Sequence, residues 1–342
     1  MSARRWSRLA LAGAVYAVAF VAMAAVGGLG YFHFANPART CASCHEMTGV
    51  HSNWSASAHR TVHCRQCHGG TLTLDVHALE SHVNRLVHHF TGGADKPVRL
   101  LENHLSALNG ACANCHPQAF AGWSAGKHAA TYAVIFLEPT QRHAEHASDE
   151  CLRCHGMFHA GGVDDLLTPP DANGGRAFRD PRVALQPAVP CLACHQVHRT
   201  DMTTHGVSYY DHRERRHFPA DLLPLATIRQ GGRDVRVSHD PRQRLCLECH
   251  APDATHQLGT ADDRTPAGVH EGLSCLDCHR AHDNSAAASC GACHPAVSHC
   301  GIGIEQMDTT FRLPASRHNV HTVACEDCHP QGRSQGMLFK GR

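Results

Sequence analysis

The motif Cys-x-x-Cys-His constrains this chain more than any other feature, because it occurs nine times in 342 residues. Its first cysteines are Cys41, Cys64, Cys112, Cys151, Cys191, Cys246, Cys275, Cys290 and Cys325. Its second cysteines are Cys44, Cys67, Cys115, Cys154, Cys194, Cys249, Cys278, Cys293 and Cys328. Its histidines are His45, His68, His116, His155, His195, His250, His279, His294 and His329. Disulfides or zinc sites would explain paired cysteines, but not a histidine after every pair.

This spacing is typical of covalent haem c attachment, in which two thiols form thioether bonds and the adjacent histidine ligates the iron. The sequence therefore predicts nine covalently bound haem c groups, each held by its motif cysteines and motif histidine. Nine haems leave about 38 residues per haem, and aromatic residues are only 6% of the chain. So thin a layer of protein cannot build a usual side-chain core. We expect a mainly α-helical chain with extensive loops, packed around the haems and largely unfolded without them.

Histidines for the second axial position are abundant, because 24 of the 33 lie outside the motifs. Bis-histidine ligation is therefore available at every iron. Two segments echo each other: Trp54-Ser-Ala-x-x-His59 and Trp123-Ser-Ala-x-x-His128 each follow a motif by a similar interval. We expect each segment to be a short helix that delivers a distal ligand. The alternative is a core-packing tryptophan beside an incidental histidine.

Other distal candidates lie close to motifs. His198 and His282 each follow a motif histidine by three residues, too closely to ligate the same iron, so we expect them to reach a neighbouring haem. His318 and His321 precede the last motif. The remaining candidates are His159 and His299.

The segment 73–93 reads as an amphipathic helix. Its apolar residues recur at three- and four-residue steps, and the helix is expected to end at Gly92-Gly93. His82 and His89 border the apolar face, which makes them candidates for contact with a haem or a quinone.

The run from Leu9 to Phe32 is 24 residues without a charge, which as a helix would span about 36 Å against a hydrocarbon core of about 30 Å. Three arginines before it place the N-terminus in the cytoplasm and the rest of the chain on the periplasmic side. A cleaved signal peptide is the alternative, because Ala22–Ala24 resembles a cleavage site. The length of the run favours a single-pass anchor in the cytoplasmic membrane. The formal charge of +1 gives no case for nucleic acid.

The first 160 residues resemble the NapC/NrfH family of membrane-anchored tetrahaem quinol dehydrogenases. The matching features are the anchor, the sequences CASCHEM, SASAH and CRQCH after it, and the third and fourth motifs. The resemblance implies that Met47 ligates the first haem in place of His45, near a quinol site, and that His59 ligates another haem. Family members often carry a lysine and an aspartate after the second motif. Here the stretch holds Glu80, His82, Arg85 and His89.

These signals divide the chain into an anchor (1–36), a tetrahaem domain (37–160), a linker rich in Gly, Pro and Asp (161–190) and a five-haem domain (191–342). They predict a cytochrome that transfers electrons between membrane quinol and an extracytoplasmic redox protein or reductase, with quinol oxidation as the favoured direction. A terminal reductase of the nitrite or hydroxylamine type is one alternative, and it needs an open iron site. A secreted cytochrome wire is another, and it requires N-terminal cleavage. Cys300, outside the motifs, is expected to be a plain buried thiol.

Overall fold

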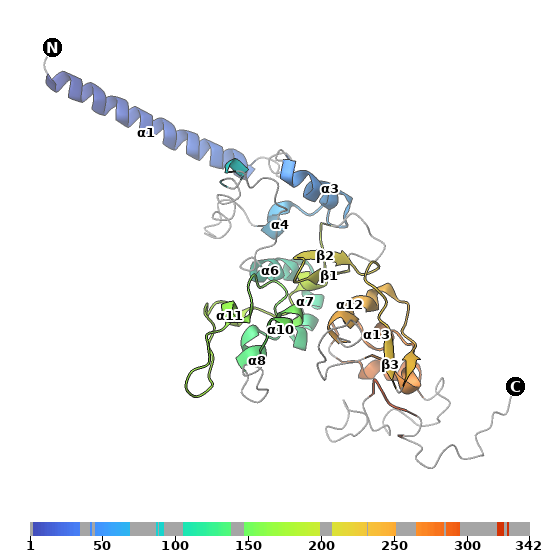
Figure 1. Ribbon diagram of the computed structural model, residues 1–342. Helices are drawn as coiled ribbons and strands as arrows, with labels where there is room; N and C mark the ends of the chain where they lie inside the picture. Colours follow the sequence, from blue (N-terminus) through green and yellow to red (C-terminus); the bar gives the residue numbers. More distant parts are fainter. Residues whose placement is uncertain are drawn as a thin grey trace, which may run out of the picture. The chain divides into compact units, whose positions relative to one another are not determined.

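The structure is a computed structural model that describes residues 3–34, 42, 45–68, 87, 89–91, 105–137, 147–198, 207–230, 232–250, 265–283, 285–294, 320–324 and 327. Within these ranges the chain is mainly helical with a few short strands, as the sequence predicts (Figure 1). It forms two compact units. Unit 1 comprises residues 1–111 and 197–200, and unit 2 comprises residues 112–196 and 201–342.

Unit 1 contains the long helix α1 (Ala3–Phe34), whose described side chains are largely exposed. Between Leu9 and Gly28 this helix is long and apolar enough to cross a membrane, and it is the one such helix in the described part of the chain. The other elements are η1 (His45–Met47), α3 (Thr48–Ala56) and α4 (Cys64–His68). Helix α6 (Leu105–Cys115) runs across the boundary into unit 2.

Unit 2 is built from short elements. Its helices and helical turns are α7 (Pro117–Ser124), η3 (Lys127–Ala129), α8 (Tyr132–Leu137), α10 (Asp149–His155), α11 (Val163–Leu166), η4 (Val183–Leu185), η5 (Cys191–Ala193), α12 (Pro241–His250), η6 (Gly268–His270), α13 (Cys275–Cys278) and η7 (Ala287–Ala292). Its strands form two antiparallel hairpins, β1 (Ser208–Asp211) with β2 (Arg216–Pro219) and β3 (Ile228–Gln230) with β4 (Arg233–Val235).

The described motifs coincide with helical turns, including α4, α10 and α13. Cysteines three residues apart lie on the same face of one helical turn. The local fold therefore presents both thiols of such a motif in one direction, which thioether attachment to a single ring requires.

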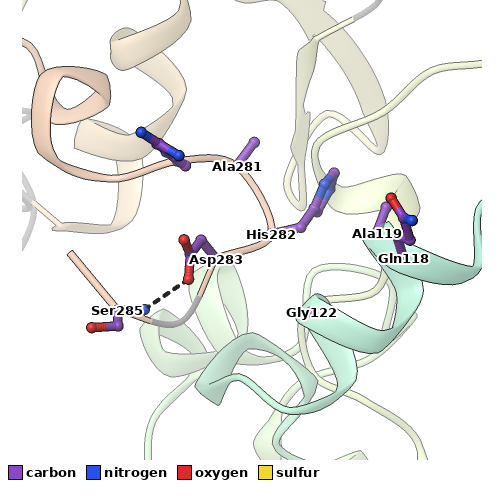
Figure 2. A pocket seen from close by; sticks show the side chains of 8 residues that line it. Gln118, Ala119, Gly122, Ala281, His282, Asp283 and Ser285 are labelled. Carbon is purple, nitrogen blue, oxygen red and sulfur yellow. Dashed lines mark hydrogen bonds between the residues drawn. The ribbon is translucent and has the colours of Figure 1, made fainter. Parts of the chain in front are cut away.

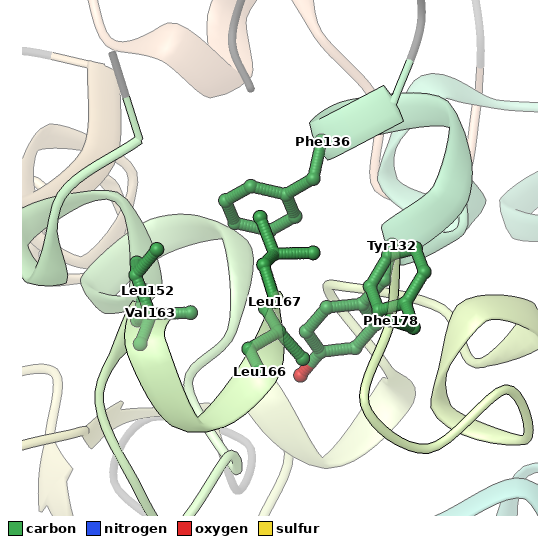
Figure 3. Close-up of a cluster of buried hydrophobic side chains, with 7 residues drawn as sticks. All are labelled: Tyr132, Phe136, Leu152, Val163, Leu166, Leu167 and Phe178. Carbon is green, nitrogen blue, oxygen red and sulfur yellow. The ribbon is translucent and has the colours of Figure 1, made fainter. Parts of the chain in front are cut away.

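A cluster of seven buried apolar side chains forms the larger core of unit 2 (Figure 3): Tyr132, Phe136, Leu152, Val163, Leu166, Leu167 and Phe178. They come from α8, α10 and the segment 163–178, so the stretch expected to be a linker packs as part of unit 2. Backbone hydrogen bonds tie it further, from Tyr132 N to Gln186 O at 3.0 Å and from Val163 N to Asp149 Oδ1 at 2.8 Å. Side-chain packing is thus greater here than the composition predicts.

A second cluster joins the β3–β4 hairpin to α12, with Ile228, Val235 and Leu247 among its members. Beside it, the Glu271 carboxylate accepts hydrogen bonds from Arg233 at 2.9 and 2.6 Å and from the backbone N–H of Arg236 at 2.8 Å. The Arg233 guanidinium, followed by the Arg236 N–H, lowers the pKa of the Glu271 carboxyl from 4.5 to about 2. This carboxylate locks the hairpin onto the segment that precedes the seventh motif.

Replacing Leu167 by alanine should lower the free energy of unfolding by about 2–5 kcal/mol, because it leaves a cavity in a fully buried cluster. Leu185, 79% exposed, is the matched control, and its replacement by alanine should change little. Chemical denaturation of the holoprotein measures both. Equal effects at the two positions would contradict the packing described for residues 163–178.

Glu271→Gln should lower the thermal midpoint at pH 7 by a few degrees. Because the folded pKa is depressed, the carboxylate stabilises fully above about pH 4.5 and loses its effect as the pH falls toward about 2. The gap between wild type and variant should therefore close over that window. Glu214→Gln, at an exposed pair 3.7 Å from Arg216, is the control and should show no gap. A gap independent of pH would rule out the charge as its cause.

Candidate functional site

Six pairs of imidazole rings recur through the described structure, and each pair joins one motif histidine to one histidine outside the motifs. The pairs are His45–His89 (5.7 Å between ring centres), His68–His198 (6.0 Å), His250–His128 (6.0 Å), His195–His282 (5.8 Å), His279–His321 (6.1 Å) and His294–His270 (6.4 Å). The first two belong to unit 1 and the other four to unit 2.

These separations fit an iron between the rings. An imidazole nitrogen binds a metal at about 2 Å, and the ring centre lies about 1 Å behind it, so two rings on opposite sides of one metal have centres about 6 Å apart. The interplanar angles run from 7° to 88°. Such variation is compatible with a common axis, because rotation about a metal–nitrogen bond leaves the ring centres in place. In the described residues no three His, Cys, Asp or Glu side chains group as a metal site.

Three of the expected distal ligands are members of these pairs. His128 lies in η3 and meets the sixth-motif histidine, and His198 meets that of the second motif. His282 follows the seventh motif and meets the fifth-motif histidine. In each pair the two histidines belong to segments attached to different motifs.

The two echoed segments form the expected short helices, α3 and α7. Both tryptophans are also anchored: Trp54 Nε1 donates to Val62 O at 3.2 Å, and Trp123 Nε1 donates to Val189 O at 3.0 Å. The tryptophan therefore fixes the helix end. In the second segment the histidine that follows is brought to a motif histidine.

Other expected ligands stand elsewhere. His59, His159, His116 and His155 are described but are not members of the six pairs. Met47 ends η1 and is half-buried. The calls on Cys41, Cys44, Glu80, His82, Arg85, His299, Cys300, His318, Cys325, Cys328 and His329 lie outside the described residues.

Two pair members were not proposed as ligands from the sequence, and a third was proposed only as a haem or quinone contact. His270 stands five residues before Cys275, and His321 stands four residues before Cys325, a regularity that could have identified them. His89 borders the predicted amphipathic helix. Its ring faces His45, the histidine whose place the family resemblance gives to Met47.

The electrostatics of the pairs favour neutral imidazole, the form that binds metal. Burial lowers the pKa of His195, and the neighbouring His282 and His116 lower it further. Burial likewise lowers the pKa of His198, with a smaller effect from His59. Rings in such surroundings are uncharged at neutral pH and present a free lone pair.

Cysteines of different motifs also meet. Side-chain hydrogen bonds join Cys112 to Cys191, Cys154 to Cys249 and Cys246 to Cys275. These contacts link the third motif to the fifth, the fourth to the sixth and the sixth to the seventh. Gln243, fully buried, reinforces the last link by accepting a hydrogen bond from Cys275 N at 2.8 Å.

A buried guanidinium provides a second fit to haem. The Nε and Nη1 atoms of Arg176 are buried and have no hydrogen-bond partner in the described structure. Two adjacent N–H donors of an arginine match a carboxylate bidentately, and each haem carries two propionates. Arg176 thus has the geometry to hold a propionate.

Compared with protein-family models, with curated proteins and with solved structures, the chain matches none.

Proposed function

We propose that this protein is a membrane-anchored nine-haem c-type cytochrome that transfers electrons between the quinone pool and an extracytoplasmic redox partner. The observation that carries the proposal is the set of six imidazole pairs at iron-ligating separation, each including a motif histidine. The motif cysteines would hold the rings covalently and the paired histidines would hold the irons. Haem iron supplies a one-electron couple when bound in this way.

The pairs favour electron transfer over the reductase alternative. An imidazole on each side fills both axial positions of an iron, and a reductase needs one of those positions open for its substrate. Closed coordination at six sites leaves the chain with outer-sphere transfer as the chemistry those sites support.

The contacts between motifs support a continuous path through unit 2. Thiols that touch carry rings whose edges lie close together, so the third, fifth, sixth and seventh motifs, with the fourth beside the sixth, would hold haems within short reach of neighbours. Cys194 of the fifth motif acts on the pKa of Cys246 and Cys249, which places the fifth motif near the sixth as well. This order differs from the order of motifs along the chain.

The anchor gives the direction. Helix α1 is long and apolar enough to hold the chain in the cytoplasmic membrane, with the haem-binding residues on the periplasmic side. The first motif follows it directly, so the His45–His89 site is the nearest to the membrane in sequence. Histidine is also a chemically adequate acceptor for protons released when quinol is oxidised.

The intact protein should carry nine haems by mass and remain in the membrane after a high-salt wash. Its haem absorption bands in isolated membranes should shift to the reduced form when a quinol is added, with dithionite defining full reduction. A mass that fits eight haems or fewer contradicts the stoichiometry. Full reduction by dithionite with none by quinol contradicts the quinol dehydrogenase assignment.

The first iron distinguishes two ligand sets. We propose His45 and His89, so His89→Leu should turn one of the nine ferric irons from low-spin to high-spin in the electron paramagnetic resonance spectrum. Met47→Leu should leave all nine unchanged, because leucine preserves the packing of a methionine. The opposite pattern, with a spin change in Met47→Leu alone, would establish Met47 as the ligand. Both variants should keep nine haems by mass.

A further inference from the structure

The backbone at His282 adopts an unusual conformation. Its φ of 63° lies in the left-handed region, which non-glycine residues rarely enter and which is associated with functional constraint. The residue belongs to the short turn after the seventh motif, closed by hydrogen bonds from Asp283 N to Arg280 O at 3.0 Å and from Ser285 N to Asp283 Oδ1 at 3.2 Å. Something outside the turn must hold this conformation.

The support comes from helix α7. The turn lies against α7 at a pocket lined by Gln118, Ala119 and Gly122 on the helix side (Figure 2). A Cβ at Gly122 would overlap the His282 carbonyl oxygen and would stand 3.1 Å from its carbonyl carbon. The helix backbone and the turn backbone therefore touch only because residue 122 has no side chain.

The glycine itself is costly where it stands. Glycine inside a helix is less stable than alanine by about 0.5–1 kcal/mol, so its presence in the middle of α7 calls for a packing reason. Gly110 in α6 offers the contrast, because a Cβ there would meet nothing within 4 Å. The close approach to His282 is the reason that the structure provides at Gly122.

The consequence of this contact lies on the other side of the turn. With its carbonyl seated on α7, His282 presents its ring to His195, with ring centres 5.8 Å apart and planes inclined by 34°. His195 belongs to the fifth motif, the turn follows the seventh, and α7 follows the third. Three motif segments thus converge on one imidazole pair.

We propose that Gly122 is a positioning residue that seats the 280–285 turn so that His282 serves as the distal ligand of the fifth haem, opposite His195. The inference rests on the proposed function. A methyl group at residue 122 displaces the turn and withdraws the imidazole, so that iron loses one axial ligand while every thioether attachment remains.

The test compares Gly122→Ala with Gly110→Ala, which makes the same change in a helix with free space. Gly122→Ala should give one high-spin ferric iron per molecule and one carbon monoxide bound per molecule after reduction. Gly110→Ala should give neither. Added imidazole should restore the low-spin spectrum of Gly122→Ala, because a free ligand replaces the withdrawn ring.

His282→Gly provides an independent variant, because glycine adopts the positive φ without strain and removes only the imidazole. It should give the same single high-spin iron, and adding Gly122→Ala to it should produce no second one. An unchanged spectrum in His282→Gly overturns the ligand assignment. An unchanged Gly122→Ala spectrum, or a further iron lost in the double variant, overturns the positioning role. A mass without haem in the wild-type protein would instead overturn the proposed function.

Discussion

The opposed imidazole pair is the interaction on which the rest of this structure depends. Each of the six pairs fixes two segments at a separation near 6 Å, and the segments are often far apart in sequence, as with His128 and His250. In the proposed holoprotein an iron joins the rings, so each pair acts as a cross-link between short elements that have little packing of their own. Helices such as η3 and α13 are too short to be stable alone and take their position from such contacts.

Side-chain packing plays a smaller but definite part. The seven-residue cluster around Phe136 and Leu167 gathers α8, α10 and α11, and the second cluster holds the β3–β4 hairpin against α12. Both clusters lie beside motif segments. They fix the backbones from which histidines extend, so the apolar residues and the imidazole pairs stabilise the same arrangement.

Close contacts between motifs connect the sites to one another. The thiol contacts and the buried Gln243 bring motifs together in an order that the chain does not follow. An electron-transfer function requires only proximity, and a fold that exchanges ligands among motif segments brings many sites near several neighbours. The seventh-motif region is the densest example, because His270, His279 and His282 belong to three different pairs within 13 residues.

The sequence alone determined what depends on local chemistry. Haem attachment is encoded within five consecutive residues, and a membrane anchor within one apolar run, so the nine motifs, helix α1 and the short helices α3 and α7 could all be read directly. The role of the nine motifs stays a prediction. Composition also favoured a linker at 161–190, because averaging over its glycines and prolines concealed the few apolar residues that pack.

Only the tertiary structure decided which histidines meet. A distal histidine is chosen by the place to which a separate segment folds, and 24 candidates cannot be sorted by spacing when the partner lies up to 122 residues away. His89 beside His45, and His270 beside His294, became evident only in three dimensions. The seat of His282 on Gly122 is the sharpest case, because it depends on the absence of one side chain in a helix that nothing in the local sequence connects to that turn.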